Sequence, residues 1–187
     1  MQVYIINNLS SSIKHIEKLI SETIKKPIII RYNRLNRVDI NTQDIVILSG
    51  SHENTAVWNG DIFKNEIEII KHHKGPLIGI CLGHQLIAHS YGSHVHLLPE
   101  KVYGLKSIEP TIETDLFDGI EEAQVFESHN WSIQKVNPPL VNLATSGSGI
   151  EILKHKERPT FGIQFHPEAL EAGDGKQIFQ RLLLEIL

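Results

Sequence analysis

The chain has 187 residues, of which 41% are hydrophobic and 21% charged, a composition typical of one globular domain with its own core. The formal net charge is −4 and the 18 Lys and Arg residues are scattered, which argues against a nucleic-acid-binding surface. The single Cys excludes an internal disulfide framework, and the sequence shows no signal segment or long apolar span, so we expect a cytoplasmic protein without a membrane partner.

The first third of the sequence alternates apolar strands with helices. Three strands are predicted, over residues 2–7, 27–32 and 44–48. Apolar residues recur at helical spacing in 13–20, after a Ser-rich cap, and again in a helix predicted over 61–73. This alternation favours a parallel sheet that is covered by helices on both faces.

An apolar run that ends at the only cysteine follows. Residues 76–80 are typical of a buried strand, and a helix-compatible segment, 82–91, begins directly after Cys81. Gly79 and Gly83 leave room for a sharp strand-to-helix turn, because a side chain at either position would collide with neighbouring backbone. Unpaired N–H groups at a helix start stabilise a thiolate, so Cys81 is predicted to be a nucleophile rather than a buried structural cysteine.

The second half of the chain changes to short strands separated by turns. Strand-like segments are predicted over residues 93–98, 102–108, 124–128, 140–145, 150–153 and 160–165, and a last helix over 176–187. We therefore expect one α/β domain, residues 1–187, in which a mostly parallel sheet continues into a mixed or antiparallel extension.

A second chemical cluster, residues 164–168, lies where the last predicted strand ends. Pro167 favours an extended conformation at His166, and the carboxylate of Glu168 can reach the imidazole and fix its tautomer. A Cys nucleophile, a His base and an orienting carboxylate form a catalytic triad by role. The loop 50–52 follows the third strand at the same edge of the sheet, where Gly50 would let backbone N–H groups face a bound oxyanion.

The 11 histidines invite a metal hypothesis, but they are dispersed. His94 and His96 are the only pair at strand spacing, and neither has a Cys or carboxylate partner at zinc-site spacing. We therefore expect no metal site and expect most of the histidines on the solvated surface.

Together, the segments 79–85 and 164–168 make the sequence resemble the class I (triad) glutamine amidotransferases over nearly its whole length. The resemblance implies a flavodoxin-like fold and hydrolysis of the side-chain amide of L-glutamine through a γ-glutamyl thioester. Carried over by position, it implies Cys81 as the nucleophile, His166 as the base and Glu168 as the group that orients the imidazole.

The same resemblance assigns residues around the triad. It implies an oxyanion site at the backbone N–H groups of Gly50, Ser51 and Leu82. It also implies that L-glutamine is positioned by Gln85, Ser128, Asn130 and Trp131. The family usually has glycine at the position of Ser51, where a serine with φ above zero would cost about 1 kcal/mol.

Resemblance to subgroups of the family implies a partner. The sequence has neither a complete phosphate-binding loop nor a Ser-Gly-Gly-x-Asp-Ser pyrophosphatase loop, so we expect no cofactor on this chain. Ammonia is then expected to pass to a separate ATP-pyrophosphatase (synthetase) subunit that binds ATP and Mg. Residues 98–104 are similar to the Glu-Tyr-Gly-like stretch of GMP synthases, which favours XMP as the acceptor, although 169–173 replace the His-Thr that usually follows the last Glu of the motif.

Three alternatives remain open at the level of the sequence. One is an amidotransferase subunit of another pathway, of the anthranilate or aminodeoxychorismate type. Another is a γ-glutamyl peptidase or hydrolase that acts alone. The third is a non-catalytic regulatory relative that uses the cleft for recognition.

Overall fold

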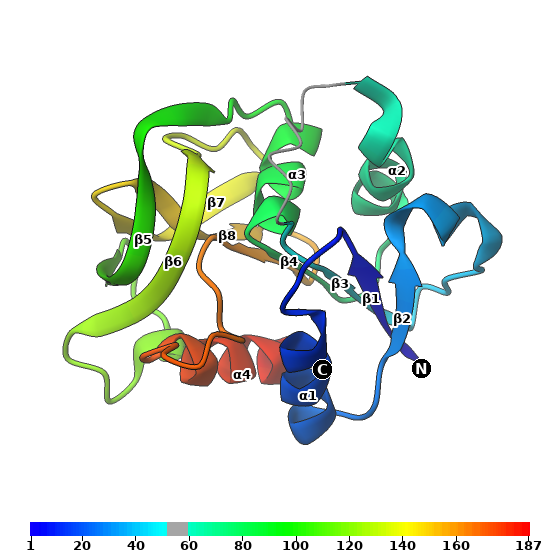
Figure 1. Cartoon of the computed structure of the whole chain (residues 1–187), viewed down its shortest axis with the longest axis horizontal. Helices are drawn as coiled ribbons and strands as arrows, with labels where there is room; N and C mark the ends of the chain where they lie inside the picture. The colour runs from blue at the N-terminus through cyan, green and yellow to red at the C-terminus, as the bar shows by residue number, and fades with distance from the viewer. Residues whose placement is uncertain (52–59) are drawn as a thin grey trace.

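The structure is a computed structural model that describes residues 1–51 and 60–187, and its described strands join in one nine-stranded sheet (Figure 1). The strands are β1 (Val3–Asn7), β2 (Ile28–Arg31), β3 (Ile45–Leu48), β4 (Leu77–Ile80), β5 (His96–Pro110), β6 (Ala123–Ser132), β7 (Leu140–Ser146), β8 (Gly149–His155) and β9 (Thr160–Ile163). The α-helices in the described ranges are α1 (Ile13–Thr23), α2 (Lys64–His72), α3 (Leu82–Ser90) and α4 (Gly175–Glu185). None of these helices is long and apolar enough to cross a membrane.

The sheet has a parallel and an antiparallel part. The strand order is β2-β1-β3-β4-β9-β8-β7-β5-β6. The pairings from β2 to β9 are parallel, and those from β9 to β6 are antiparallel. The predicted α/β fold, with helices around a parallel sheet that continues into an antiparallel extension, is therefore confirmed.

Helices cover both faces of the parallel part (Figure 1). On one face α1 and α4 bury residues such as Ile16 and Phe179 against the core that contains Ile5. On the other face α2 and α3 pack against the core that contains Ile6. Successive residues of β1 thus belong to opposite cores, and this explains why the strand is apolar at nearly every position rather than alternating with polar residues.

The antiparallel part differs from the prediction in the extent of its strands. The segments predicted as two strands, 93–98 and 102–108, are joined in the single 15-residue strand β5, which begins only at His96. Its partner β6 extends to Ser132, beyond the predicted end at Ser128. The two strands pair along their length with a register shift between Leu97 and Val102. An irregularity of this kind interrupts the period-2 pattern of the sequence but not the hydrogen-bonded ribbon.

The expectation that most histidines lie on the solvated surface is wrong for four of them. His73, His84, His129 and His155 are buried. His84, on α3, lies against Gly162 of β9, where an added Cβ would come within 2.8 Å of the His84 Nδ1. Burial lowers the pKa of His84 to about 3, so this imidazole is neutral at physiological pH.

Candidate active site

Cys81 occupies a sharp turn between β4 and α3. Its φ of 50° and ψ of −99° lie outside the regions that L-residues ordinarily adopt. Its N–H donates a hydrogen bond of 2.8 Å to the carbonyl of Ile163 on the neighbouring strand β9. The residue is also the N-cap of α3, so the first N–H groups of the helix lie beside it. The structure thus contains the strand-to-helix turn that the sequence predicted.

Two glycines make this turn possible. A Cβ on Gly79 would lie 2.3 Å from the carbonyl carbon of Gly83, and a Cβ on Gly83 would lie 2.5 Å from the carbonyl oxygen of Leu48. Both distances are far below van der Waals contact, and both involve backbone atoms that cannot rotate away. The collision that the sequence predicted for side chains at these two positions is therefore confirmed.

His166 and Glu168 lie in the loop after β9, and their side chains are in contact. Nδ1 of His166 is 2.9 Å from Oε1 of Glu168, and the Glu168 side chain is almost completely buried. The backbone N–H of His166 donates to the carbonyl of Phe126 on β6 at 2.8 Å, which fixes the loop against the sheet. Because a carboxylate only accepts, Nδ1 carries the proton in this contact and the Nε2 side is left for chemistry.

The charge state of His166 depends on Cys81. Burial alone lowers the pKa of His166, but the charge of the Cys81 sulfur and the contact with Glu168 outweigh it and raise the pKa well above the usual value. Nε2 of His166 is buried and makes no well-formed hydrogen bond within the described residues. The electrostatics therefore favour a protonated His166 imidazole beside the Cys81 sulfur.

Gly50 lies against both of these side chains. A Cβ added to Gly50 would be 3.3 Å from Cε1 of His166 and 3.4 Å from Cβ of Cys81. The hydroxyl of Ser49 donates to the Gly50 carbonyl at 2.9 Å. Ser49 is in turn held by Asn8, which follows β1, through hydrogen bonds of 2.9 and 3.0 Å. Two strand ends thus fix the backbone of the predicted oxyanion loop beside Cys81 and His166.

The structure gives less detail for the other residues of the predicted oxyanion loop and site. Leu82 is the first residue of α3 and is buried directly after Cys81. Ser51 is not among the described residues with positive φ, so the strain that we considered for a serine here does not arise in this conformation. His52, the last residue of the predicted loop, lies outside the described residues.

The four residues predicted to hold L-glutamine come from two elements. Gln85 is buried on α3, whereas Ser128, Asn130 and Trp131 are half-buried on β6. Nε2 of Gln85 donates to the Trp131 carbonyl at 3.1 Å, which joins the two elements. Ser128 and Asn130 alternate along β6 with the buried residues of the strand and share its more exposed face.

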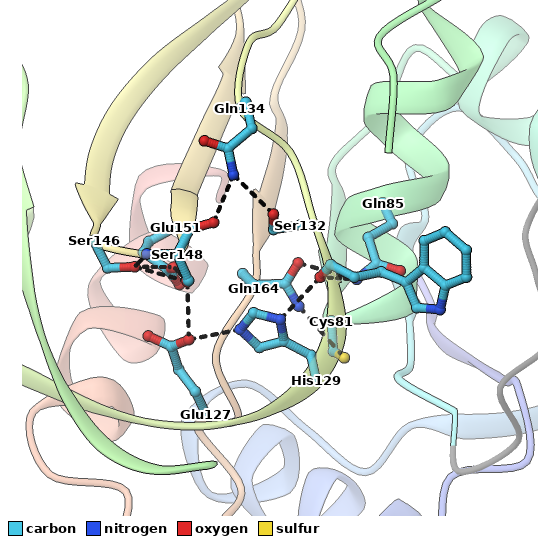
Figure 2. A network of polar contacts seen from close by, with 11 residues as sticks. Cys81, Gln85, Glu127, His129, Ser132, Gln134, Ser146, Ser148, Glu151 and Gln164 are labelled. Atoms are coloured by element: carbon cyan, nitrogen blue, oxygen red, sulfur yellow. Dashed lines mark hydrogen bonds and ion pairs between the residues drawn. The ribbon is translucent and has the colours of Figure 1, made fainter. Parts of the chain in front are cut away.

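Gln164, which the sequence placed in a motif without a role, lies between these groups and the cysteine (Figure 2). Its Oε1 accepts from Nε2 of Gln85 at 3.1 Å, and its Nε2 donates to the Cys81 sulfur at 3.6 Å. The only signal in the sequence was its position two residues before His166.

A buried cluster of two carboxyls and an imidazole lies further from the cysteine (Figure 2). The donor atoms of Glu127, His129 and Glu151 lie within 4.8 Å of one another, and a His with two carboxylates is a donor set that zinc accepts. Nε2 of His129 is already engaged with Oε2 of Glu127 at 2.6 Å. Burial, followed by the charge of Glu127, raises the pKa of Glu151 to about 8. Our expectation that the chain has no metal site stays a prediction.

The sequence and the fold were compared with known proteins. The profile of the glutamine amidotransferase class-I domain matches residues 4–186. A glutamine-hydrolysing GMP synthase subunit of Methanobrevibacter smithii is 30% identical over 184 residues, which cover 96% of this chain and 93% of that protein. The subunit of the same name from Methanothermobacter thermautotrophicus is 37% identical over 118 residues, and the match spans 62% of this chain and 63% of that relative. A crystal structure assigned to a GMP synthase subunit from Thermoplasma acidophilum superimposes with a TM-score of 0.84 at 25% identity and covers all of this chain and 93% of its own.

Proposed function

The chain belongs to the class I glutamine amidotransferases, and we propose that it is the glutaminase subunit of a two-subunit GMP synthase. The observation that carries the proposed chemistry is the convergence of Cys81, His166 and Gly50. The strained turn presents the sulfur, the imidazole lies beside it with Glu168 on its far side, and the glycine backbone closes the third side.

In the first half of the proposed reaction the Cys81 thiolate attacks the carbonyl carbon of the glutamine side-chain amide. The oxyanion that forms would be stabilised by the N–H groups of Leu82 and the Gly50–Ser51 segment, and one such donor typically contributes about 3 kcal/mol. The His166 imidazolium gives its Nε2 proton to the amide nitrogen. The carbon–nitrogen bond then breaks, ammonia leaves, and a γ-glutamyl thioester remains on the sulfur.

In the second half water hydrolyses the thioester. Neutral His166 takes a proton from the attacking water, and the same oxyanion donors hold the second tetrahedral intermediate. Glutamate leaves as the carbon–sulfur bond breaks, which restores the thiolate and the imidazolium. Glu168 supports both halves, because its carboxylate stabilises the positive ring and keeps Nδ1 protonated.

The ammonia is proposed to be used by a separate synthetase subunit that binds ATP and Mg and converts XMP to GMP. The relatives named as subunits of glutamine-hydrolysing GMP synthases support this assignment, and one of them aligns over almost the whole chain. We propose that L-glutamine is the substrate of this chain and that the chain itself uses no cofactor.

The test is reconstitution with a cognate GMP synthetase subunit, ATP and XMP. Glutamine-dependent GMP formation should be lost in Cys81→Ala, whereas GMP formation from added ammonium salt should survive this substitution. A parallel series with chorismate and its synthase subunit tests the anthranilate-type alternative. GMP formation that does not depend on this chain when glutamine is the nitrogen source would contradict the proposal.

The γ-glutamyl peptidase alternative makes a different prediction. Such an enzyme would cleave γ-glutamyl substrates at full rate without a partner, and XMP with the synthetase would change nothing. Covalent labelling of Cys81 by a glutamine-analogue electrophile such as diazo-oxo-norleucine separates both enzymes from a non-catalytic relative. Stoichiometric labelling that is absent in Cys81→Ala is the expected result.

A further inference from the structure

A chain of hydrogen bonds runs from the Cys81 sulfur into the interior of the molecule (Figure 2). Gln164 Nε2 donates to the sulfur at 3.6 Å. Gln85 Nε2 donates to Gln164 Oε1 and to the Trp131 carbonyl, both at 3.1 Å. Nδ1 of His129 is 2.9 Å from the same carbonyl. Groups on α3, on β6 and after β9 are thereby joined in one line that ends at the nucleophile.

The direction of each bond in this line is fixed by chemistry. The Trp131 carbonyl can only accept, so the Gln85 group that faces it is the NH₂ end of the amide. That NH₂ group also faces Gln164, which must then offer its oxygen to Gln85 and its own NH₂ to the sulfur. If the Gln164 amide were flipped, two NH₂ groups would face each other and an oxygen would face the thiolate, both of which are repulsive.

The same carbonyl fixes the tautomer of His129. Nδ1 must carry a proton, since its partner has only lone pairs. Nε2 lies 2.6 Å from Oε2 of Glu127, with both side chains buried, so one further proton is shared within that contact. Glu127 therefore holds the His129 ring with its Nδ1–H directed at the Trp131 carbonyl. Glu168 holds the His166 ring in a similar way.

We propose that Gln164 presents an N–H to the Cys81 sulfur and that His129 fixes this orientation as a positioning residue. The His129 N–H holds the Trp131 carbonyl in place. That carbonyl, which can only accept, sets the orientation of the Gln85 amide and through it the orientation of Gln164. The consequence is stabilisation of the Cys81 thiolate by a second group besides His166. The inference deepens the proposed function and rests on it, because it concerns the nucleophile of the same reaction.

Among the described residues, three other titratable groups lie around His129. Glu127 lies on the same strand, Glu151 on β8 and His84 on α3. Oε1 of Glu151 accepts from the hydroxyls of Ser146 and Ser148 at 2.7 and 3.1 Å.

Two substitutions of His129 separate positioning from a structural role. His129→Asn puts an amide N–H near the place of Nδ1 and keeps the contact with Trp131 while losing Glu127. His129→Gln puts the amide near the place of Nε2 and keeps Glu127 while losing Trp131. The measurement is the rate of Cys81 alkylation by iodoacetamide as a function of pH, together with the ultraviolet absorbance of the thiolate. Neither readout requires glutamine, so the test stands even if the proposed reaction is wrong.

We expect His129→Gln to slow alkylation at neutral pH by about tenfold and to move the thiolate titration to higher pH. His129→Asn should remain within about twofold of the unaltered protein. Gln164→Met, which keeps the length of the side chain but removes the donor, should resemble His129→Gln. Thermal unfolding of each variant identifies any that fail to fold. In that case Glu127→Gln, whose amide can still donate to Nε2 of His129, provides a second test of the same line of hydrogen bonds in a folded protein.

Four results would overturn the inference. One is equal alkylation profiles for the two His129 variants, and another is an unchanged profile in Gln164→Met. The third is a stoichiometric metal ion whose removal by a chelator shifts the thiolate titration, since the metal and not Glu127 would then hold His129. A loss of glutaminase activity in His129→Gln or Gln164→Met with an unchanged Cys81 titration would also count against the inference. That result would leave the proposed function intact.

Discussion

Gly83, in the first turn of α3, packs directly onto the carbonyl oxygen of Leu48 at the end of β3. A methyl group at Gly83 would lie 2.5 Å from this oxygen, so Gly83→Ala must push the nucleophile helix away from the sheet. We expect a loss of about 1–3 kcal/mol in the free energy of unfolding, measured by urea denaturation, and a lower rate of Cys81 labelling. Gly147→Ala is the matched control, because an added Cβ there meets nothing within 4 Å.

Equal unfolding free energies for the two alanine variants would contradict this packing. A stability loss without slower Cys81 labelling would show that the turn tolerates displacement of the helix.

The two residues of the His166–Glu168 pair should differ in how much catalysis they support. His166→Ala removes the proposed base and acid, so glutamine hydrolysis should fall by at least about 100-fold. Glu168→Gln should be milder, since the amide oxygen can still accept from Nδ1 while the stabilising charge is lost. Steady-state kinetics, with single-turnover measurement of the thioester, separate the two. Near-normal thioester formation in His166→Ala would contradict the assignment of His166 as the base.

Asn8 should influence catalysis through the backbone of Gly50. Its Nδ2 donates to the carbonyl of Ser49 at 3.0 Å, and Asn8→Ala leaves that buried carbonyl without this donor. We expect a loss of about 1–3 kcal/mol in stability and a fall in kcat that exceeds any change in KM, because an oxyanion site acts in the transition state. Asn137→Ala is the control, since it removes a comparable bond to the Gly92 carbonyl at an exposed position. A KM effect alone would argue against oxyanion binding at this loop.

Glu66 on α2 gives a prediction for the dependence of stability on pH. The carboxyl is almost completely buried, and burial raises its pKa from 4.5 to about 8. Between these two values the folded state keeps a proton that the unfolded state has released, so unfolding becomes easier as pH rises through this range. One such group changes the free energy of unfolding by about 1.4 kcal/mol per pH unit.

Glu66→Gln should remove this slope. The variant is expected to be more stable than the unaltered protein at pH 8 and nearly equal to it at pH 4.5, the two ends of the range over which Glu66 titrates. Urea denaturation at several pH values provides the measurement, and Glu113→Gln on the exposed surface controls for the loss of one carboxylate. Parallel stability curves for the two proteins would show that Glu66 titrates normally.

Local pattern was sufficient to predict the nucleophile turn. The apolar run before Cys81, the two glycines and the helical segment after it all lie within a few residues, and each restricts the backbone in the same place. The strand-helix alternation likewise predicted the parallel sheet, because strands buried on both faces must be apolar along their whole length. The contact between His166 and Glu168 was predicted for a related reason, since Pro167 between them limits the backbone and brings the ring to the carboxylate.

The tertiary structure alone decided the surroundings of the cysteine. Gln85, the His129–Trp131 segment and Gln164 come from three separate parts of the sequence, and only the packing of α3 against β6 and the segment after β9 brings them into one line of hydrogen bonds. Glu127 and Glu151 have no spacing that marks them, because residues on different strands meet according to register and not according to distance along the chain. The same holds for the buried histidines: burial is a property of what other elements cover, and no single segment of sequence contains it.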